Sequence, residues 1–251
     1  MHTSGGLTDM VICHSRNPNT GEVGHFYERD GILYPSVTTI LESEIPKGKN
    51  DPIERWKRRN KNWKELQRRS QIVGTIGHFR ILNRLSDRTI EIPEIGVHEF
   101  PDDLEDLLDI IDFLWDESGF ETRIGYPRKI ESTLISHTHK FAGKPDLRCP
   151  IKCDDGHTRL AVVDLKTSNA VYDKYIYQLA AYGLMMEESP EHNQFPDVGI
   201  VINLSPYEDK NPHMVPKVTE FPKAKLLKYA AEFAEMAKNY HARFGDPVSE
   251  N

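Results

Sequence analysis

One apolar run of this chain carries a carboxylate and an amine near its end. The segment from Leu160 to Thr167 reads L-A-V-V-D-L-K-T, and its first four residues are all apolar. A strand that is apolar at successive positions is buried on both faces, which is typical of the centre of an α/β sheet. Residues two apart share one face of a strand, so Asp164 and Lys166 project together. Of all the sequence features, this strand constrains the fold most, because a fold that buries it must also place the charged pair at its end.

Helical and strand patterns surround this central strand. Apolar residues recur at helical spacing in four further segments, at Ser70–Leu85, Pro101–Ser118, Tyr172–Glu188 and Pro222–Phe244. Strand-like runs occupy Arg123–Tyr126, Lys129–His137, Phe141–Leu147, Pro196–Asn203 and Val215–Thr219, with a hairpin turn within Pro150–His157. This order predicts an α/β fold with a mixed central β-sheet flanked by helices and an N-terminal helical elaboration. We expect one domain over residues 1–251, with an N-terminal part (1–118) and a core (119–251).

The N-terminal part begins with a hairpin signal and continues into helices. Asp30-Gly31, flanked by aromatic and β-branched residues, predicts a hairpin over about Gly24–Tyr34, whereas Ser36–Leu41 fits either a helix start or a buried run. Asp51-Pro52 opens a helix with an apolar stripe, in which we expect the tryptophans to be core rather than a platform for stacking bases. The stripe consists of Ile53, Trp56, Trp63 and Leu66. The next helix contains Gly74 and Gly77, which predict the close approach of a backbone or a ligand.

Charge is distributed unevenly along the chain. The net charge is −7, yet residues 47–88 contain 13 Lys or Arg and only 4 Asp or Glu. Such a segment predicts a phosphate-binding surface, although a solvated basic helix face is the alternative. The side chains expected to contact substrate there are Arg58, Arg59, Lys61 and Arg80. The helix around Leu104–Trp115 is acidic and is expected to be a solvated face.

Two further acids precede the central strand, and polar residues follow it. If the preceding strand pairs with it, Asp146 converges with Asp164, and two close carboxylates favour a cation between them. Carboxylate, carbonyl and water ligands suit Mg²⁺ or Mn²⁺, and a lysine beside the metal can orient or deprotonate a water. Glu131, one strand earlier, is a further ligand or base. On the next helix Gln178 and Tyr182 share a face with Tyr175, where the alternative is ordinary core packing.

These motifs together resemble a nuclease superfamily. P-D at 145–146, D-L-K at 164–166 and Q-L-A-A-Y at 178–182 resemble the PD-(D/E)XK nucleases, and G-T-I-G-H ending at His78 is similar to their RecB-like branch. That branch includes RecB and AddAB nuclease domains, CRISPR-associated nucleases and the mitochondrial genome-maintenance exonuclease. The motifs span His78–Tyr182, about two-fifths of the chain.

The resemblance implies roles for individual residues and a fold like that of restriction endonucleases. It implies that His78, Asp146, Asp164 and the Leu165 carbonyl bind a divalent metal, and that Lys166 is the catalytic lysine. It also implies that Glu131 is a helper acid and that Gln178 and Tyr182 contact substrate or brace the site. Members with an iron–sulfur cluster carry four cysteines, but this chain has three, so no cluster is expected. Zinc held by Cys149, Cys153 and His157 is a minor alternative that lacks a fourth ligand.

The combined features predict a Mg²⁺- or Mn²⁺-dependent deoxyribonuclease. Family analogy and the basic helices favour an exonuclease that acts on single-stranded DNA ends. A duplex exonuclease or a structure-specific endonuclease stays open. So do two alternatives of other classes: a non-catalytic nucleic-acid-binding protein, and a partner subunit of a recombination or spacer-acquisition complex that docks through the acidic helix. Neither a secretory signal nor a transmembrane run is recognisable, so we expect a cytoplasmic protein that does not bind membranes.

Overall fold

A computed structural model describes residues 12–17, 21–45, 52–92, 100–168, 170–207 and 211–247, with the backbone only at 52–53. The basic residues Lys47 and Lys49 and the predicted helix cap Asp51 lie outside the described residues. Within the described part, no helix combines the length and the apolar character needed to cross a bilayer.

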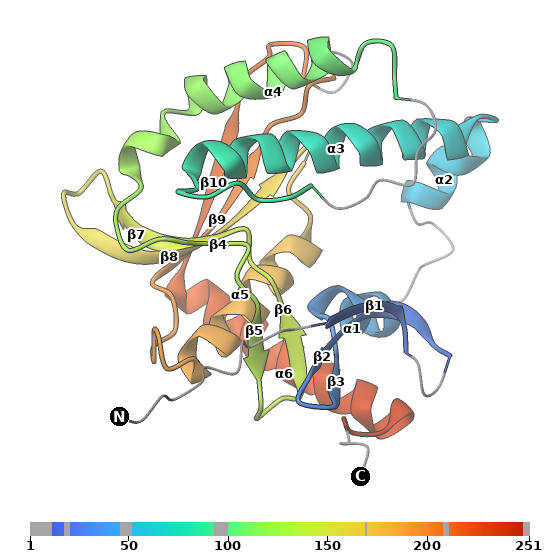
Figure 1. The fold of residues 1–251 in the computed structure, drawn as a ribbon, viewed down its shortest axis with the longest axis vertical. Helices are drawn as coiled ribbons and strands as arrows, with labels where there is room; N and C mark the ends of the chain where they lie inside the picture. Colours follow the sequence, from blue (N-terminus) through green and yellow to red (C-terminus); the bar gives the residue numbers. More distant parts are fainter. Residues whose placement is uncertain are drawn as a thin grey trace, which may run out of the picture.

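A five-stranded mixed sheet forms the centre of the molecule (Figure 1). Its order is β10-β9-β8-β7-β4, in which β8 and β9 run parallel and the other neighbours are antiparallel. The strands are β4 (Lys129–Ile130), β7 (Leu147–Lys152), β8 (Thr158–Lys166), β9 (Val198–Asn203) and β10 (Lys217–Pro222). The predicted central strand is β8, and the predicted mixed α/β architecture is confirmed.

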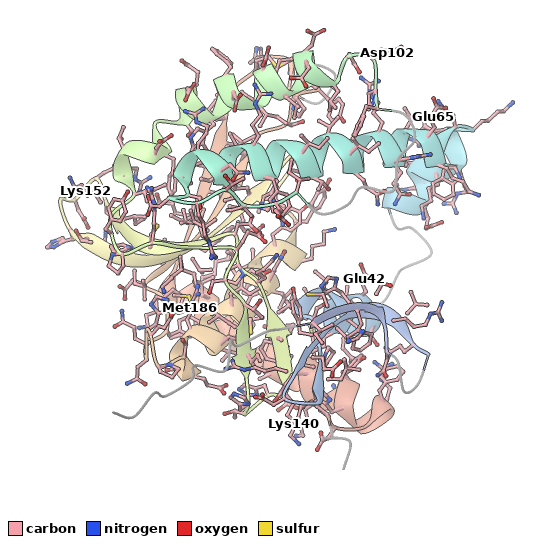
Figure 2. All side chains as sticks on the ribbon, viewed as in Figure 1. Glu42, Glu65, Asp102, Lys140, Lys152 and Met186 are labelled. Atoms are coloured by element: carbon pink, nitrogen blue, oxygen red, sulfur yellow. The ribbon has the colours of Figure 1, made fainter. Side chains whose placement is uncertain are left out.

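Helices cover both faces of this sheet (Figure 1). On one face lie α3 (Trp63–Leu85) and α4 (Leu104–Ser118), and on the other α5 (Asp173–Glu188) and α6 (Lys223–Phe244). Val163 and Leu165 pack into the α3–α4 core, whereas Val162 packs into the α5–α6 core, where Figure 2 labels Met186. Because side chains alternate along a strand, Asp164 lies on the α5 side of the sheet.

A smaller lobe formed by the N-terminal segment packs beside α6 (Figure 1). It contains a sheet of β1 (Ile12–Arg16), β2 (Val23–Arg29) and β3 (Ile32–Pro35), and the helix α1 (Val37–Glu44). The predicted hairpin is confirmed, since Asp30 and Gly31 have φ of +54° and +73°, as a tight primed turn requires. The ambiguous segment at Ser36 begins α1, where the Ser36 hydroxyl accepts a hydrogen bond from the Thr39 N–H.

The predicted strands before β8 are divided between two sheets. The chain leaves the central sheet after β4, forms a separate two-stranded sheet of β5 (Leu134–Ser136) and β6 (Phe141–Gly143), and returns at β7. The prediction of one strand over Phe141–Leu147 is therefore wrong, since β6 ends at Gly143 and β7 begins at Leu147. Period-two alternation does not reveal which sheet a strand joins. The strand predicted at Arg123–Tyr126 is also wrong, since a 3₁₀ turn occupies Phe120–Arg123 and only Ile124 forms a bridge.

The helices of the basic segment break at a different point from the one predicted. A short helix α2 (Pro52–Arg59) ends before Asn60, and α3 then runs without a break through the predicted boundary at Ser70. Trp56 is 37% exposed, and Trp63 is half-buried with the Lys57 amine 4.8 Å from its ring centroid. The prediction that these tryptophans are core is wrong. The predicted apolar stripe assumed one continuous helix, but the chain breaks between α2 and α3, so Trp56 and Trp63 do not lie on one helix face.

The glycines of α3 lie against side chains of neighbouring elements rather than against the backbone or ligand that was predicted. A Cβ added to Gly77 would lie 2.5 Å from Cδ1 of the buried Ile111 on α4, and one added to Gly74 would lie 2.9 Å from Thr167 Oγ1 after β8. Gly77 therefore sets the spacing of α3 against α4, and Gly74 sets that of α3 against the end of β8.

Gly77→Ala is expected to lower the free energy of unfolding by about 1–2 kcal/mol. Overpacking a core contact costs about 1–3 kcal/mol, and the better helix propensity of alanine returns up to about 1 kcal/mol. Urea denaturation followed by circular dichroism measures the change. Gln71→Ala, at an exposed position of the same helix, is the control and is expected to be neutral or slightly stabilising. Equal stability of Gly77→Ala and wild type would contradict this account of the α3–α4 packing.

Candidate metal centre and active-site cavity

The acids of the site meet where β7 begins and β8 ends. Leu147 of β7 lies opposite Val163 of β8, and continuing this antiparallel register by one residue places Asp146 opposite Asp164. The Leu165 N–H donates a 2.6 Å hydrogen bond to Asp146 Oδ2, which ties the carboxylate to the end of β8. The backbone N–H of Glu131 in turn donates to the Asp146 carbonyl oxygen, so Glu131 lies beside Asp146.

His78 reaches these acids from α3. Its Nε2 lies 3.1 Å from Asp146 Oδ2 and 3.8 Å from Glu131 Oε1. One ligand atom from each of the three residues falls within 4.8 Å of the others. The resemblance implies that His78 lies close to the acids, although it is distant from them in sequence. The structure brings His78, Glu131 and Asp146 together.

His78, Glu131 and Asp146 fit a divalent cation. Among the described residues they are the only group of three or more His, Cys, Asp or Glu with ligand atoms close enough to share one ion. One imidazole and two carboxylates suit Mn²⁺, and the carboxylates also suit Mg²⁺. Asp164, expected as a ligand, lies outside this group, and Glu131 takes its place. The Oδ1 of Asp164 is nevertheless buried without a hydrogen-bond partner among the described residues. That oxygen is available to a metal or a water.

Partly buried Lys166 and fully buried Asp164 form an ion pair next to the metal group. Lys166 Nζ lies 2.7 Å from Asp164 Oδ2. The ammonium also lies 4.9 Å from the ring centroid of Tyr175, whose hydroxyl donates to Ser168 Oγ. Asp164 and the aromatic ring thus hold the amine in one position.

Burial and mutual repulsion perturb the acids and bases of the site. Burial raises the pKa of Asp164 to about 6, although Lys166 opposes the shift. Burial also raises the pKa of Glu131, and the charge of Asp146 adds to it. Burial alone would lower the pKa of Lys166, but Asp164 and Asp146 outweigh it, and the pKa lies above its ordinary value. The raised pKa favours the ammonium form of Lys166, which suits a group that orients water and neutralises charge.

The pKa values of His78 and Asp146 move apart because the two groups form a pair. Burial alone would lower the pKa of His78, but Asp146 and then Glu131 outweigh it and raise the pKa above its ordinary value. Burial alone would raise the pKa of Asp146, but His78, Lys166 and the Leu165 N–H hold it below its usual range. The pairing of His78 with Asp146 thus favours the imidazolium form of His78.

The affinity for Mn²⁺ is expected to rise with pH. A metal ligand must be deprotonated, so a His78 pKa above 6.5 keeps a competing proton on the imidazole to a higher pH than in a free histidine. We expect the dissociation constant to fall up to about tenfold per pH unit from pH 5.5 upward and to level off once His78 is neutral. Calorimetry in two buffers of different ionisation enthalpy counts the released protons. Binding that releases no proton at pH 6 would contradict the ligand role of His78.

His78, Asp146, Asp164 and Lys166 line a cavity of about 310 Å³ between α3 and α5. Gln178 and Tyr182 line it from α5, and Gln178 Nε2 donates a 2.8 Å hydrogen bond to Tyr182 Oη. Tyr182 is buried, so the pair braces the wall of the cavity. Tyr175 contributes through Lys166 instead, because it packs against the amine. Leu165 lines the cavity and contributes its N–H to Asp146.

Lys144 was not predicted and belongs to this cavity. Its Nζ pairs with Glu131 Oε2, and its side chain lines the cavity beside Asp146. Gly143 ends β6 and Pro145-Asp146 precedes β7, so Lys144 lies on the crossing between the two sheets. The only sequence signal was its position next to Pro145-Asp146.

The structure places the basic residues of the predicted substrate surface at two different locations. Arg58, Arg59 and Lys61 are exposed on α2 and on the break that follows it, and none of them is among the described residues that line the cavity. Arg80 pairs instead with acids of α4, at 2.6 Å to Asp112 and 3.0 Å to Asp109. The DNA contact predicted for Arg80 therefore has no support from its position.

The acidic helix is paired with α3 rather than fully solvated. Arg84 lies 2.6 Å from Asp116, and Arg69 pairs with Asp103 just before α4. Figure 2 shows the beginnings of both helices at the same end of the molecule, where Glu65 and Asp102 are labelled, so α3 and α4 run in the same direction. Acids of the predicted docking surface thus balance arginines of the basic segment.

The cysteine alternative has no geometric support. Cys149 is fully buried within the α3–α4 core, and burial raises the pKa of its thiol to about 12. A thiol must ionise to bind zinc, so this environment opposes a site built on Cys149.

Comparison with known proteins adds little to this geometry. No family model matches the chain, and no curated protein matches it. Thirteen chains of solved structures match, including one titled "Crystal structure of SSO0001", with 17% identity and a TM-score of 0.30. The alignment covers 59% of this chain and 63% of that one, less than two thirds of its length. A TM-score this low does not establish a shared fold.

Proposed function

We propose that this protein is a Mg²⁺- or Mn²⁺-dependent deoxyribonuclease that hydrolyses phosphodiester bonds. The observation that carries the proposal is the gathering of His78, Glu131 and Asp146 within 4.8 Å, beside a cavity that His78, Asp146, Asp164 and Lys166 line. A cation site beside a partly buried ammonium suits a reaction in which negative charge grows on phosphoryl oxygens. The order of these residues also supports membership of the PD-(D/E)XK superfamily.

Each residue has a role in the proposed reaction. His78, Glu131 and Asp146 would hold the ion, which when bound supplies Lewis-acid stabilisation of the phosphate charge. Lys166 donates hydrogen bonds to the attacking water and to a phosphoryl oxygen, while Asp164 fixes the amine. Because burial raises the pKa of Asp164 to about 6 and its Oδ1 has no hydrogen-bond partner among the described residues, this cavity-lining carboxylate suits an acceptor for the proton of the water.

The exposed residues Arg58, Arg59 and Lys61, here called the basic arm, favour single-stranded DNA as the substrate. Trp56 is partly exposed on α2 beside Arg58 and Arg59, and Lys61 follows in the break. Aromatic rings among cations bind single strands without sequence preference through base stacking and phosphate contacts. We therefore propose an exonuclease that acts on single-stranded ends in the cytoplasm. The alternatives of a non-catalytic DNA-binding protein and of a partner subunit differ from it in lacking hydrolysis.

Incubation with three end-labelled or circular substrates tests this function. We expect linear single-stranded DNA to be degraded with Mn²⁺ or Mg²⁺ and to survive with EDTA, whereas circular single strands resist and blunt duplexes react slowly. Cleavage of the circle would show an endonuclease. Failure of the folded, Mn²⁺-binding protein to cut any of the three would overturn the proposal and favour the binding alternative.

A further inference from the structure

A second cavity adjoins the first, on the side of the N-terminal lobe. It measures about 170 Å³ and lies between β2, the start of α1 and the end of β6. Lys144 and Tyr182 line both cavities, so these two side chains form the wall that the cavities share. The second cavity therefore lies directly beside the metal group, and the predicted site residues other than Tyr182 do not line it.

The floor of this second cavity is apolar and aromatic. Tyr27, Val37, Gly143 and Tyr182 line it and are all buried. A Cβ added to Gly143 would lie 2.8 Å from Tyr182 Cε1 and 3.2 Å from Val37 Cγ2, so glycine keeps the floor closely packed. Tyr27 is only 7% exposed, and its ring lies 5.0 Å from that of His25. A flat ligand with apolar faces fits such a floor.

The rim of the cavity is polar and accessible. His25 and Thr38 are exposed at the rim, and the side chain of Lys144 is 36% exposed between the two cavities. The rim thus offers an imidazole, a hydroxyl and an ammonium to the edges of a ligand whose faces contact the floor. A nucleobase has this distribution, with apolar faces and polar edges, and its phosphate would lie toward Lys144.

We propose that this second cavity holds the unpaired nucleotide adjacent to the phosphodiester that the first cavity receives. The inference rests on the proposed function and deepens it, because it assigns a binding site to one nucleotide of the single strand. A base within an intact duplex is paired and stacked on its neighbours and cannot enter, whereas a base of a single strand can turn into the cavity at small cost. Lys144 then contacts the phosphate that connects the two cavities.

Two substitutions at the rim test the assignment. His25→Ala removes a ring from the rim, and Thr38→Phe adds bulk at the mouth; both positions are exposed and outside the metal group. Anisotropy of a labelled single strand, with Ca²⁺ as the ion, measures binding. We expect the dissociation constant to rise about fivefold or more in both variants, since stacking of one base contributes at least about 1 kcal/mol. Thymidine 5′-monophosphate should compete with the strand in the wild type and not in Thr38→Phe.

The control is His157→Ala, at an exposed position in the turn between β7 and β8, which is expected to bind as the wild type does. Unchanged strand binding by both folded rim variants would overturn the second cavity as a nucleotide site, while cleavage by the wild type would leave the nuclease function standing. Weaker binding by the variants together with absence of metal-dependent cleavage would support the nucleotide site and overturn the nuclease function.

Discussion

Lys166→Met is expected to lower the rate of phosphodiester hydrolysis by about a thousandfold. Removal of one preorganised charge that stabilises a transition state costs about 10²–10³ in rate, and an amine that also orients the water adds to this loss. Methionine keeps an unbranched chain next to the Tyr175 ring, so the cavity wall is preserved while the charge 2.7 Å from Asp164 is lost. Single-turnover cleavage of a labelled single strand at saturating Mn²⁺ measures the rate.

A matched control is available on the neighbouring helix. Lys174 is exposed on α5 and lies 5.4 Å from the centroid of the same Tyr175 ring, so Lys174→Met removes an equivalent charge outside the ion pair with Asp164. We expect Lys174→Met to cleave at close to the wild-type rate. We expect Lys166→Met to retain its affinity for DNA and Mn²⁺, because the groups proposed to bind the metal are intact. A Lys166→Met rate within tenfold of the wild type would remove this residue from the mechanism.

Asp146→Asn is expected to weaken the binding of Mn²⁺ by about a hundredfold or more. Asp146 contacts His78 and accepts the hydrogen bond of Leu165, and asparagine keeps that acceptor while it removes the charge. Loss of even an outer partner of a metal ligand costs about 10–100-fold in affinity, and loss of a charged ligand costs at least as much. Isothermal titration calorimetry with Mn²⁺ measures the affinity directly.

Thermal unfolding gives a second readout of the same loss. At an ion concentration of 100 times its Kd, binding stabilises the wild type by about 2.7 kcal/mol, which raises the Tm of a chain of this size by about 5–10 °C. At the same concentration a hundredfold weaker site contributes about 0.4 kcal/mol, and the shift falls to about 1 °C. Asp155→Asn, in the exposed turn before β8, is the control and should retain the full shift. An Mn²⁺-induced shift in Asp146→Asn equal to that of the wild type would place the ion elsewhere.

The central pair of acids could be predicted from the chain because its geometry is local. Period-two alternation puts Asp164 and Lys166 on one face of β8, and the short turn between β7 and β8 sets the register that brings Asp146 opposite Asp164. By contrast, no spacing rule connects His78 to this pair. It was expected from the resemblance, and its distance to Asp146 depends on how α3 crosses the end of the sheet, which the packing of Gly74 and Gly77 controls.

The ion pairs of the basic segment, by contrast, could not be predicted from the sequence. The charge count of residues 47–88 includes only the acids of that segment, so it predicts that Arg80 is free to contact DNA. In the fold, α4 lies along α3 and supplies Asp109, Asp112 and Asp116 to Arg80 and Arg84. Charge counted along a sequence cannot include partners that tertiary packing brings from another helix. Of the four side chains predicted to contact substrate, Arg58, Arg59 and Lys61 keep the exposure that the prediction required.

By itself, the sequence determined the mixed α/β architecture, the buried strand β8 and the pairing of Asp164 with Lys166, because these follow from side-chain periodicity and short-range register. Tertiary structure alone decided that Glu131 rather than Asp164 joins His78 and Asp146, and that Lys144 stands between two cavities. Those outcomes depend on the crossing from β6 to β7 between two sheets and on the approach of α3. Ligand distances of a few ångströms arise from the positions of whole elements, which no local pattern contains.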